Sequence, residues 1–140
     1  MKYVNCTGFA CTVWAGETKD EEISVMVIDA EPSDTVSLQR EYIEMDTMDG
    51  IPVKAYRVTQ IKNMPEPLPE TVFIVSPSVL DYINRHTQRT DFVCMADKVY
   101  KRFDKDGNLI RDYEMSEDDE YDIIRVGYRA FSYGDINDLM

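Results

Sequence analysis

Residues 66–80 read Glu-Pro-Leu-Pro-Glu-Thr-Val-Phe-Ile-Val-Ser-Pro-Ser-Val-Leu, and the rest of the predicted fold is arranged around this segment. A proline-rich loop leads into Val72–Val75, which has no polar residue on either face and therefore predicts a short central strand buried on both sides. Pro77 fixes the turn that follows, and Ser76 or Ser78 can cap the first amides of a helix. The segment thus predicts a loop, a central strand and the start of a helix.

On the N-terminal side of this segment, the sequence predicts three short strands, at Tyr3-Val4, Thr12–Trp14 and Ile23–Ile28. Asp49-Gly50 is a tight-turn signal between two further β-type runs, so residues 36–45 and 51–60 predict a hairpin. The apolar period changes within the first of these runs, which indicates a β-bulge.

On the C-terminal side, Val79–Arg85 has apolar residues at helical spacing and predicts a helix of about two turns. Strands are predicted at residues 91–96, 99–103 and 121–131, with a hairpin turn at 104–108 and a C-terminal tail at 132–140 that adds a helical turn. The sequence therefore predicts an α+β fold: a single domain over residues 1–140, mainly antiparallel β-sheet, with one or two short helices.

The composition is that of a globular chain, because 44% of the 140 residues are hydrophobic and 11% are aromatic. No apolar run reaches the length of a membrane span, and the N-terminus lacks the apolar region of a signal peptide. The three cysteines are expected to be reduced thiols. We therefore expect a cytoplasmic protein.

The formal net charge of −12 is the strongest statement of the composition. A phosphate backbone would be repelled by most of such a surface, so we expect no direct binding of nucleic acid. A protein with a basic surface is the more plausible partner. The alternative, that the acidity serves only solubility, stays open.

Part of this charge lies in an acidic loop at residues 112–122, which has no basic residue between its acids. Its seven acidic residues are Asp112, Glu114, Glu117, Asp118, Asp119, Glu120 and Asp122. Such a density of charge can form a partner surface, or it can be a solvated, mobile loop. The sequence alone does not choose between the two.

A second candidate site is an anion pocket at the start of the predicted helix. The amides and the positive dipole end of a helix N-terminus attract phosphate, and nearby arginines would strengthen such a site. The candidate residues are Arg57, Ser76, Ser78 and Arg102. Plain capping of the helix by the serines is the competing interpretation.

The sequence gives no catalytic residues, metal site or cofactor. His86 could pair with Cys94 or with a serine, but no recognised motif surrounds any of them. Asp104–Asn108 resembles the start of a calcium loop, yet Leu109 stands where that loop needs glycine and Met115 where it needs glutamate. A hairpin turn is the simpler interpretation.

Several motifs follow one another between residues 3 and about 112. They are Val4–Phe9, Ser33–Val36, Gly50–Val53 with Arg57, Met64–Pro67, Phe73–Ser76, Arg89–Cys94 and Arg102–Ile110. In their order they resemble a family of small bacteriophage and prophage proteins that carries Leu-Pro-Glu-Pro, Tyr-Ile-Val-Ser and Asp-Gly motifs. The family's Pro-His pair is Gly8-Phe9 here, and the tail from Asp112 onward extends beyond its pattern.

The resemblance implies a phage accessory protein in the host cytoplasm, because no catalytic residue set is known for the family. We therefore expect a non-enzymatic binding protein that counters a host defence or regulatory system by stoichiometric binding of a basic host protein. The alternative is a sponge that sequesters a small phosphorylated or cyclic nucleotide. An enzyme is the weakest hypothesis, and assembly into a homo-oligomer stays open.

Overall fold

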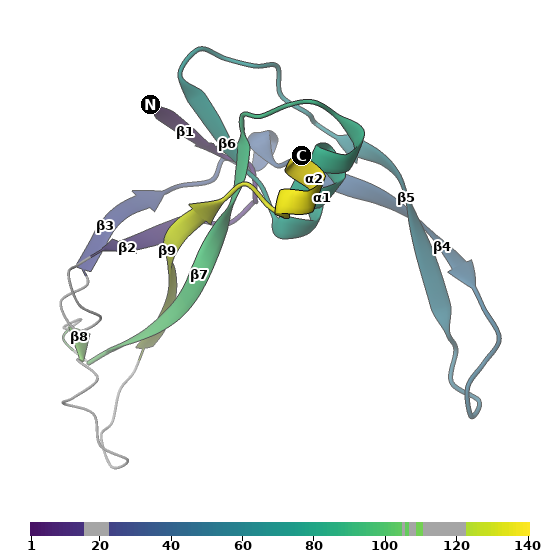
Figure 1. Ribbon diagram of the computed structural model, residues 1–140. Coiled ribbons are helices and arrows are strands. Elements are labelled where there is room, and N and C mark those ends of the chain that lie inside the picture. Colours follow the sequence, from purple (N-terminus) through teal and green to yellow (C-terminus); the bar gives the residue numbers. More distant parts are fainter. Residues whose placement is uncertain (16–22, 105, 107–108, 111–122) are drawn as a thin grey trace.

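The computed structural model describes residues 1–15, 23–104, 106, 109–110 and 123–140, and it is rich in strands (Figure 1). The strands are β1 (Lys2–Asn5), β2 (Cys11–Ala15), β3 (Ile23–Ile28), β4 (Ser37–Glu44), β5 (Lys54–Lys62), β6 (Thr71–Ile74), β7 (Phe92–Phe103), β8 (Leu109–Ile110) and β9 (Ile123–Ser132). The helices are the 3-10 helix η2 (Pro32–Asp34) and the α-helices α1 (Pro77–His86) and α2 (Ile136–Leu139). The prediction of one small, strand-rich domain with short helices is confirmed.

Strand β6 has the central position that its apolar sequence predicts. It lies between β1 and β7, with Val4 and Phe92 both in register with Phe73. Phe73 and Ile74 are buried, and both neighbouring strands run parallel to β6. The chain leaves β6 through helix α1 and returns in β7, which is the strand–helix–strand connection that parallel pairing requires.

The main sheet has the strand order β1-β6-β7-β9-β2-β3, and β8 pairs with β7. The expectation of a mainly antiparallel sheet needs correction, because β1–β6, β6–β7 and β2–β9 are parallel pairs among the described strands. A bridge between Asn5 and Ala30 joins the two outer edges, so the sheet closes almost into a barrel. The two-sided apolar run of β6 is typical of parallel strands, but it does not identify their neighbours.

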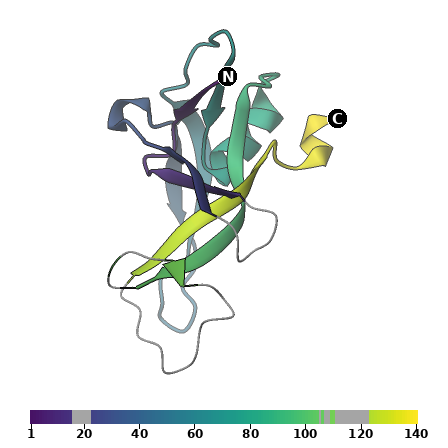
Figure 2. The same cartoon turned by 90° about the vertical axis from the view of Figure 1, so that its left-hand side faces the viewer.

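Strand β7 joins two segments that the sequence predicts as separate strands. It runs from Phe92 to Phe103 and pairs first with β6 and then with β9, as the long curved ribbon in Figure 2 shows. Asp97 lies at φ 57°, an uncommon backbone conformation for a residue with a side chain, and it interrupts the regular strand. Its neighbours Ala96 and Lys98 keep their pairing with β9, so the strand bends without losing register.

Helix α1 covers the core with the face that its spacing predicts. Val79, Leu80 and Ile83 are buried there. The main core cluster around these three residues contains Cys6, Val36, Phe73, Val75, Phe92 and Cys94. Ser76 is the N-cap residue, but its side chain makes no capping hydrogen bond, which differs from the simplest expectation.

Strands β4 and β5 form the predicted hairpin and project from the rest of the molecule as an arm, residues 37–62 (Figure 1). At the turn, Asp49 and Gly50 have positive φ, and Met48 and Ile51 exchange two backbone hydrogen bonds of 3.0 and 2.7 Å. This is the pattern of a two-residue hairpin turn. The predicted bulge lies between Gln39 and Arg40.

The C-terminal tail contains the predicted helical turn, α2, and packs beside α1. The Asn84 side chain donates a 2.8 Å hydrogen bond to the Tyr133 carbonyl, and Arg85 lies 3.2 Å from the Asp138 carboxylate. No helix in the part of the chain that the structure describes is long and apolar enough to cross a membrane. The acidic segment at 112–122 lies outside the described residues.

Candidate functional site

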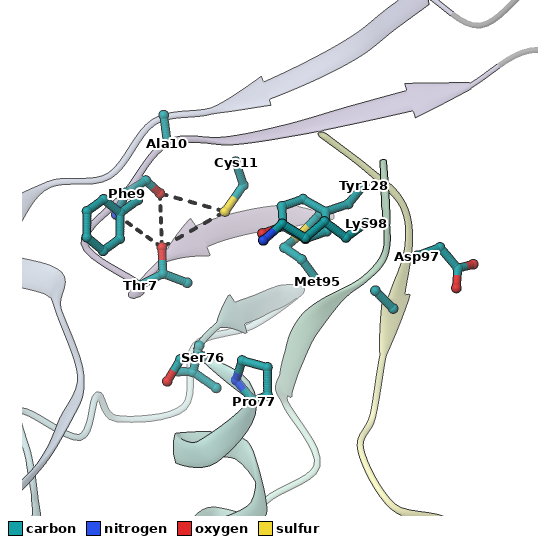
Figure 3. A pocket seen from close by; sticks show the side chains of 12 residues that line it. Thr7, Phe9, Ala10, Cys11, Ser76, Pro77, Met95, Asp97, Lys98 and Tyr128 are labelled. Carbon is teal, nitrogen blue, oxygen red and sulfur yellow. Dashed lines mark hydrogen bonds between the residues drawn. The ribbon is translucent and has the colours of Figure 1, made fainter. Parts of the chain in front are cut away.

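A hollow of about 500 Å³ lies where β6 ends and helix α1 begins (Figure 3). Its walls come from the β1–β2 loop, from the β6–α1 turn, and from the middle of β7 and β9. The lining residues are Thr7, Phe9, Ala10, Cys11, Val75, Ser76, Pro77, Met95, Ala96, Asp97, Lys98 and Tyr128. The carboxyl ends of parallel strands and a helix N-terminus are common places for ligands, so this α1 hollow is a candidate binding site.

The thiol of Cys11 in the α1 hollow is held in a polar network and is not an activated nucleophile. The Thr7 hydroxyl donates to Asn5 Oδ1 at 2.6 Å, and the Asn5 amide group lies 3.5 Å from Cys11 Sγ. Burial raises the pKa of Cys11, although hydrogen bonds with Thr7 and Asn5 oppose this effect. Because the thiolate is the reactive form, Cys11 has little reactivity near neutral pH.

The charged groups of the α1 hollow are Asp97 and Lys98, which are neighbours on β7. The Lys98 ammonium lies 5.6 Å from the centre of the Tyr100 ring, and the Ser76 hydroxyl makes no capping bond. One lysine and the start of a helix can attract a small anion. The lining residues form no pair of carboxylates and no nucleophile–base pair.

A second hollow, the base groove, lies between α1 and the base of the arm and has a volume of about 220 Å³. Its lining residues are Leu38, Arg40, Tyr56, Val58, Ser78, Asp81, Tyr82, Arg85 and His86. The Arg40 guanidinium lies 5.0 Å from the centre of the Tyr56 ring, and the Tyr82 and His86 rings are 4.2 Å apart. The groove therefore has apolar and aromatic walls and carries cationic groups.

The structure does not bring the four predicted ligand-binding residues into one site. Ser76 lines the α1 hollow, whereas Ser78 lines the base groove. Arg57 lies on β5, where it makes a 2.9 Å ion pair with Glu41 across the arm. Arg102 lies near the far end of β7, opposite Ile110 of β8. Neither arginine lines either hollow.

The two residues of the hypothetical catalytic pair, a histidine and a cysteine, lie in different surroundings. His86 is exposed at the end of α1 beside Tyr82, whereas Cys94 is buried in the core. Burial and the charge of Asp81 raise the pKa of Cys94, and a hydrogen bond with Ser132 opposes this. No hydrogen bond joins His86 to Cys94, and within the described ranges no group of three or more His, Cys, Asp or Glu could hold a metal ion.

The segment that resembles the start of a calcium loop is described only in part. The Asp106 amide donates a 2.9 Å hydrogen bond to the Asp104 carboxylate, which is typical of a turn. Residues 105, 107 and 108 lie outside the described ranges.

The most exposed apolar surface in the central part of the chain is on the arm. All residues from Gln39 to Pro52 are exposed. The large apolar side chains among them and on β5 are Tyr42, Ile43, Met45, Met48, Ile51 and Tyr56. Sequence reasoning missed them as a surface, because alternating β-branched and aromatic residues are equally typical of strands inside a sheet.

Charge is distributed unevenly along the arm. The whole arm has four basic and four acidic residues and is formally neutral. The arm tip, residues 44–53, carries three acids (Glu44, Asp46 and Asp49) and no lysine or arginine; the nearest basic residue is Lys54. None of the three acids has an ion-pair partner among the described residues. The tip is therefore both acidic and apolar.

Comparisons of this chain with protein-family models, with curated proteins and with solved structures found no match.

Proposed function

We propose that this chain is a non-enzymatic binding protein that engages another polypeptide through the β4–β5 arm, with the arm tip against a basic, partly apolar surface. In the phage setting that the sequence resemblance implies, the protein is an accessory factor. It acts on a host defence or regulatory system by stoichiometric binding.

The observation that supports this proposal is the exposure of apolar side chains along the arm. Met48 is 68% exposed and Ile51 is 66% exposed at the turn, and Tyr42 and Tyr56 are exposed along the strands. A concentration of exposed large apolar side chains is typical of interaction sites. A two-stranded hairpin is also marginally stable alone, and its open edges can pair with another chain. A partner would stabilise the arm by covering it.

The charge of the tip supports the same kind of partner. Glu44, Asp46 and Asp49 make no ion pair among the described residues, although Lys54 lies opposite Glu44 in the ladder. A basic surface would be attracted to the three exposed carboxylates of the tip, and the net charge of −12 would speed the approach of a basic partner. Binding is expected to weaken as salt concentration rises.

Binding without turnover is consistent with the chemistry of the described thiols. Burial raises the pKa of Cys6 to about 11, with a smaller effect from Asp34, and burial also raises the pKa of Cys11 and Cys94. All three groups are protonated near neutral pH and are poor nucleophiles.

Site-specific photo-crosslinking tests the arm as the docking element. A photo-crosslinking amino acid in place of Met48 is expected to give a covalent adduct with another polypeptide in the producing cell. The same amino acid in place of Leu68, which is 51% exposed in a loop outside the arm, is the matched control and is expected to give none. Equal adducts from both positions, or no adduct from position 48, would contradict the proposal.

The α1 hollow favours a second candidate function, the sequestration of a small phosphorylated or cyclic nucleotide. The specific observation is that Ser76, with its free hydroxyl, and Lys98 line a hollow of about 500 Å³ at the start of a helix. Tight binding to the native state would raise the melting temperature, and the rise would grow with the logarithm of the free ligand concentration above the Kd. The test is a thermal-shift series with cyclic dinucleotides and ADP-ribose derivatives. A shift that Lys98→Ala reduces and Lys62→Ala leaves unchanged would support a sponge, and no shift would exclude these ligands.

A further inference from the structure

We infer that the polypeptide engaged by the arm is a second copy of this chain. The two arms lie antiparallel to each other, so that each arm tip enters the other copy's base groove. This inference rests on the proposed function, because it keeps the arm as the docking element, but it replaces the host protein by a second copy as the arm's partner. It assigns a role to the base groove, which the proposal above leaves unused.

The two ends of the arm are complementary in charge. The tip carries Glu44, Asp46 and Asp49, whereas the charged residues that line the base groove are Arg40, Arg85 and one carboxylate, Asp81. Arg85 is already paired with Asp138 at 3.2 Å, which leaves Arg40 as the groove's other basic side chain. Arg40 has an aromatic contact with Tyr56 but no ion pair among the described residues. A carboxylate from the arm tip of another copy would give Arg40 an ion-pair partner.

The apolar surfaces of the two ends are complementary as well. Leu38, Val58, Tyr56 and Tyr82 form apolar and aromatic walls in the base groove. Its volume of about 220 Å³ is below the range of about 300–1,000 Å³ that is usual for small-molecule pockets. A space of this size is better suited to one or two apolar side chains, and the tip presents such side chains, Met48 among them.

Two-fold symmetry makes both contacts at once. The ladder from Ser37–Lys62 to Glu44–Lys54 is about 25 Å long at the usual rise of a strand. Two arms of equal length that lie antiparallel bring the tip of one copy to the base of the other, and the same contact recurs at the other end. In such an isologous interface each copy supplies one arm tip and one base groove. Pairing of the open strand edges would then extend two hairpins into one four-stranded sheet.

Charge also favours this arrangement of two copies over contacts between their acidic surfaces. Two chains of net charge −12 repel one another over most orientations. The arm is formally neutral, and the antiparallel arrangement places each acidic tip beside Arg40, with Asp81 as the one carboxylate that lines the groove. The acidic surface elsewhere on each copy is left open for a basic partner.

Analytical ultracentrifugation of charge-reversal variants tests the inference. We expect the wild-type chain to be a dimer that dissociates on dilution. Arg40→Glu and the double variant Glu44→Lys/Asp46→Lys, which leaves the Asp49-Gly50 turn intact, are each expected to weaken self-association by about a hundredfold, because each places like charges together at both contacts. The matched controls Lys2→Glu and Asp29→Lys/Glu31→Lys make the same changes of charge at exposed positions outside the arm and are expected to leave the dimer intact.

An equimolar mixture of the two arm variants gives the sharpest result. Each tip then meets a groove of opposite charge, so the mixture is expected to form a heterodimer although neither variant forms a dimer alone. Since these residues are exposed, circular dichroism and Trp14 fluorescence are expected to match wild type, which separates lost association from misfolding.

The remaining outcomes separate the inference from the proposed function. A wild-type chain that is monomeric at every concentration overturns the inference. So does a dimer whose dissociation constant is unchanged in the charge-reversal variants of the arm. If the chain is monomeric and a probe at position 48 still crosslinks to a different polypeptide, the proposed function stands and the inference fails. If a probe at position 48 gives no adduct of any kind, both fail.

Discussion

The ladder between β7 and β9 and the ladder between β4 and β5 are two antiparallel pairs of similar length with opposite surroundings. In the barrel-like body, β7 begins and ends in buried residues such as Phe92 and Phe103, and Trp14 packs beside the latter. In the arm, Tyr42 and Tyr56 face each other in register, and both are exposed. Local sequence makes both ladders, and the elements packed around a ladder decide whether its side chains become core or interaction surface.

This contrast predicts that substitutions in the body cost stability, whereas equivalent substitutions in the arm cost little stability and change binding. The strongest case is Gly127 on β9, because a Cβ atom there would lie 1.3 Å from Trp14 Nε1. Gly127→Ala must displace the buried tryptophan, and we expect a loss of about 3 kcal/mol in the free energy of unfolding. Chemical denaturation followed by the fluorescence of this single tryptophan measures it.

The matched change in the arm is Gly50→Ala. A Cβ atom at Gly50 meets nothing within 4 Å, so the cost comes only from its φ of 78°. We expect about 1 kcal/mol or less, as is usual for a left-handed turn position. Equal losses from the two variants would show that the arm is packed as tightly as the body.

The next largest effect is expected at Asn5, which links the edges of the barrel-like sheet. Its amide group donates to the Phe9 and Ile28 carbonyls at 2.6 and 2.9 Å, and its carbonyl accepts from the Thr7 amide at 3.0 Å. Asn5→Leu removes the amide that satisfies the buried Ile28 carbonyl and the oxygen that accepts from the Thr7 amide, and we expect a loss of about 2 kcal/mol. Gln60→Leu removes an exposed amide that bonds to Gln39 in the arm, and we expect a change below about 0.5 kcal/mol in the same denaturation experiment.

The difference between body and arm also marks how far sequence reasoning reaches. Short-range signals predicted the elements well: Asp49-Gly50 predicted the hairpin, and the spacing of Val79, Leu80 and Ile83 predicted helix α1. Long-range relations were not predicted, since nothing local shows that β6 has parallel neighbours on both sides or that Asn5 bridges to Ala30. The candidate site failed for the same reason: Ser76 and Ser78 are two residues apart, yet they line different hollows.

Two ion pairs allow the contrast to be measured as a function of pH. In the body, the Arg89 guanidinium makes two 2.8 Å bonds to Asp91, and this hydrogen bonding lowers the pKa of Asp91. A lowered folded-state pKa stabilises the protein above the unfolded value of about 4, and the contribution is lost as the pH falls through the folded-state pKa. We expect Asp91→Asn to cost about 1 kcal/mol at neutral pH and nothing in strong acid.

The arm pair between Arg57 and Glu41 is the control for this pH experiment. Both side chains are more than half exposed, so solvent screens the pair, and Glu41→Gln is expected to change stability very little at any pH. Urea denaturation of wild type and both variants between strong acid and neutral pH measures the two differences. A pH-independent loss in Asp91→Asn would mean that Asp91 acts through packing and not through its charge.

The smallest effect on the stability of a single copy, and the most informative one, is expected at the arm tip. Met48→Ser/Ile51→Ser removes two exposed side chains that pack against nothing in the body, so the free energy of unfolding of an isolated copy is expected to change by less than about 0.5 kcal/mol. Association adds a second quantity, because a dimer that forms only from folded chains raises the urea midpoint as protein concentration rises. The wild-type midpoint is therefore expected to depend on concentration, while that of the tip variant does not. Leu68→Ser, an exposed loop substitution, is expected to retain the dependence. If both midpoints were independent of concentration, the exposed tip would have to be explained by a partner other than a second copy.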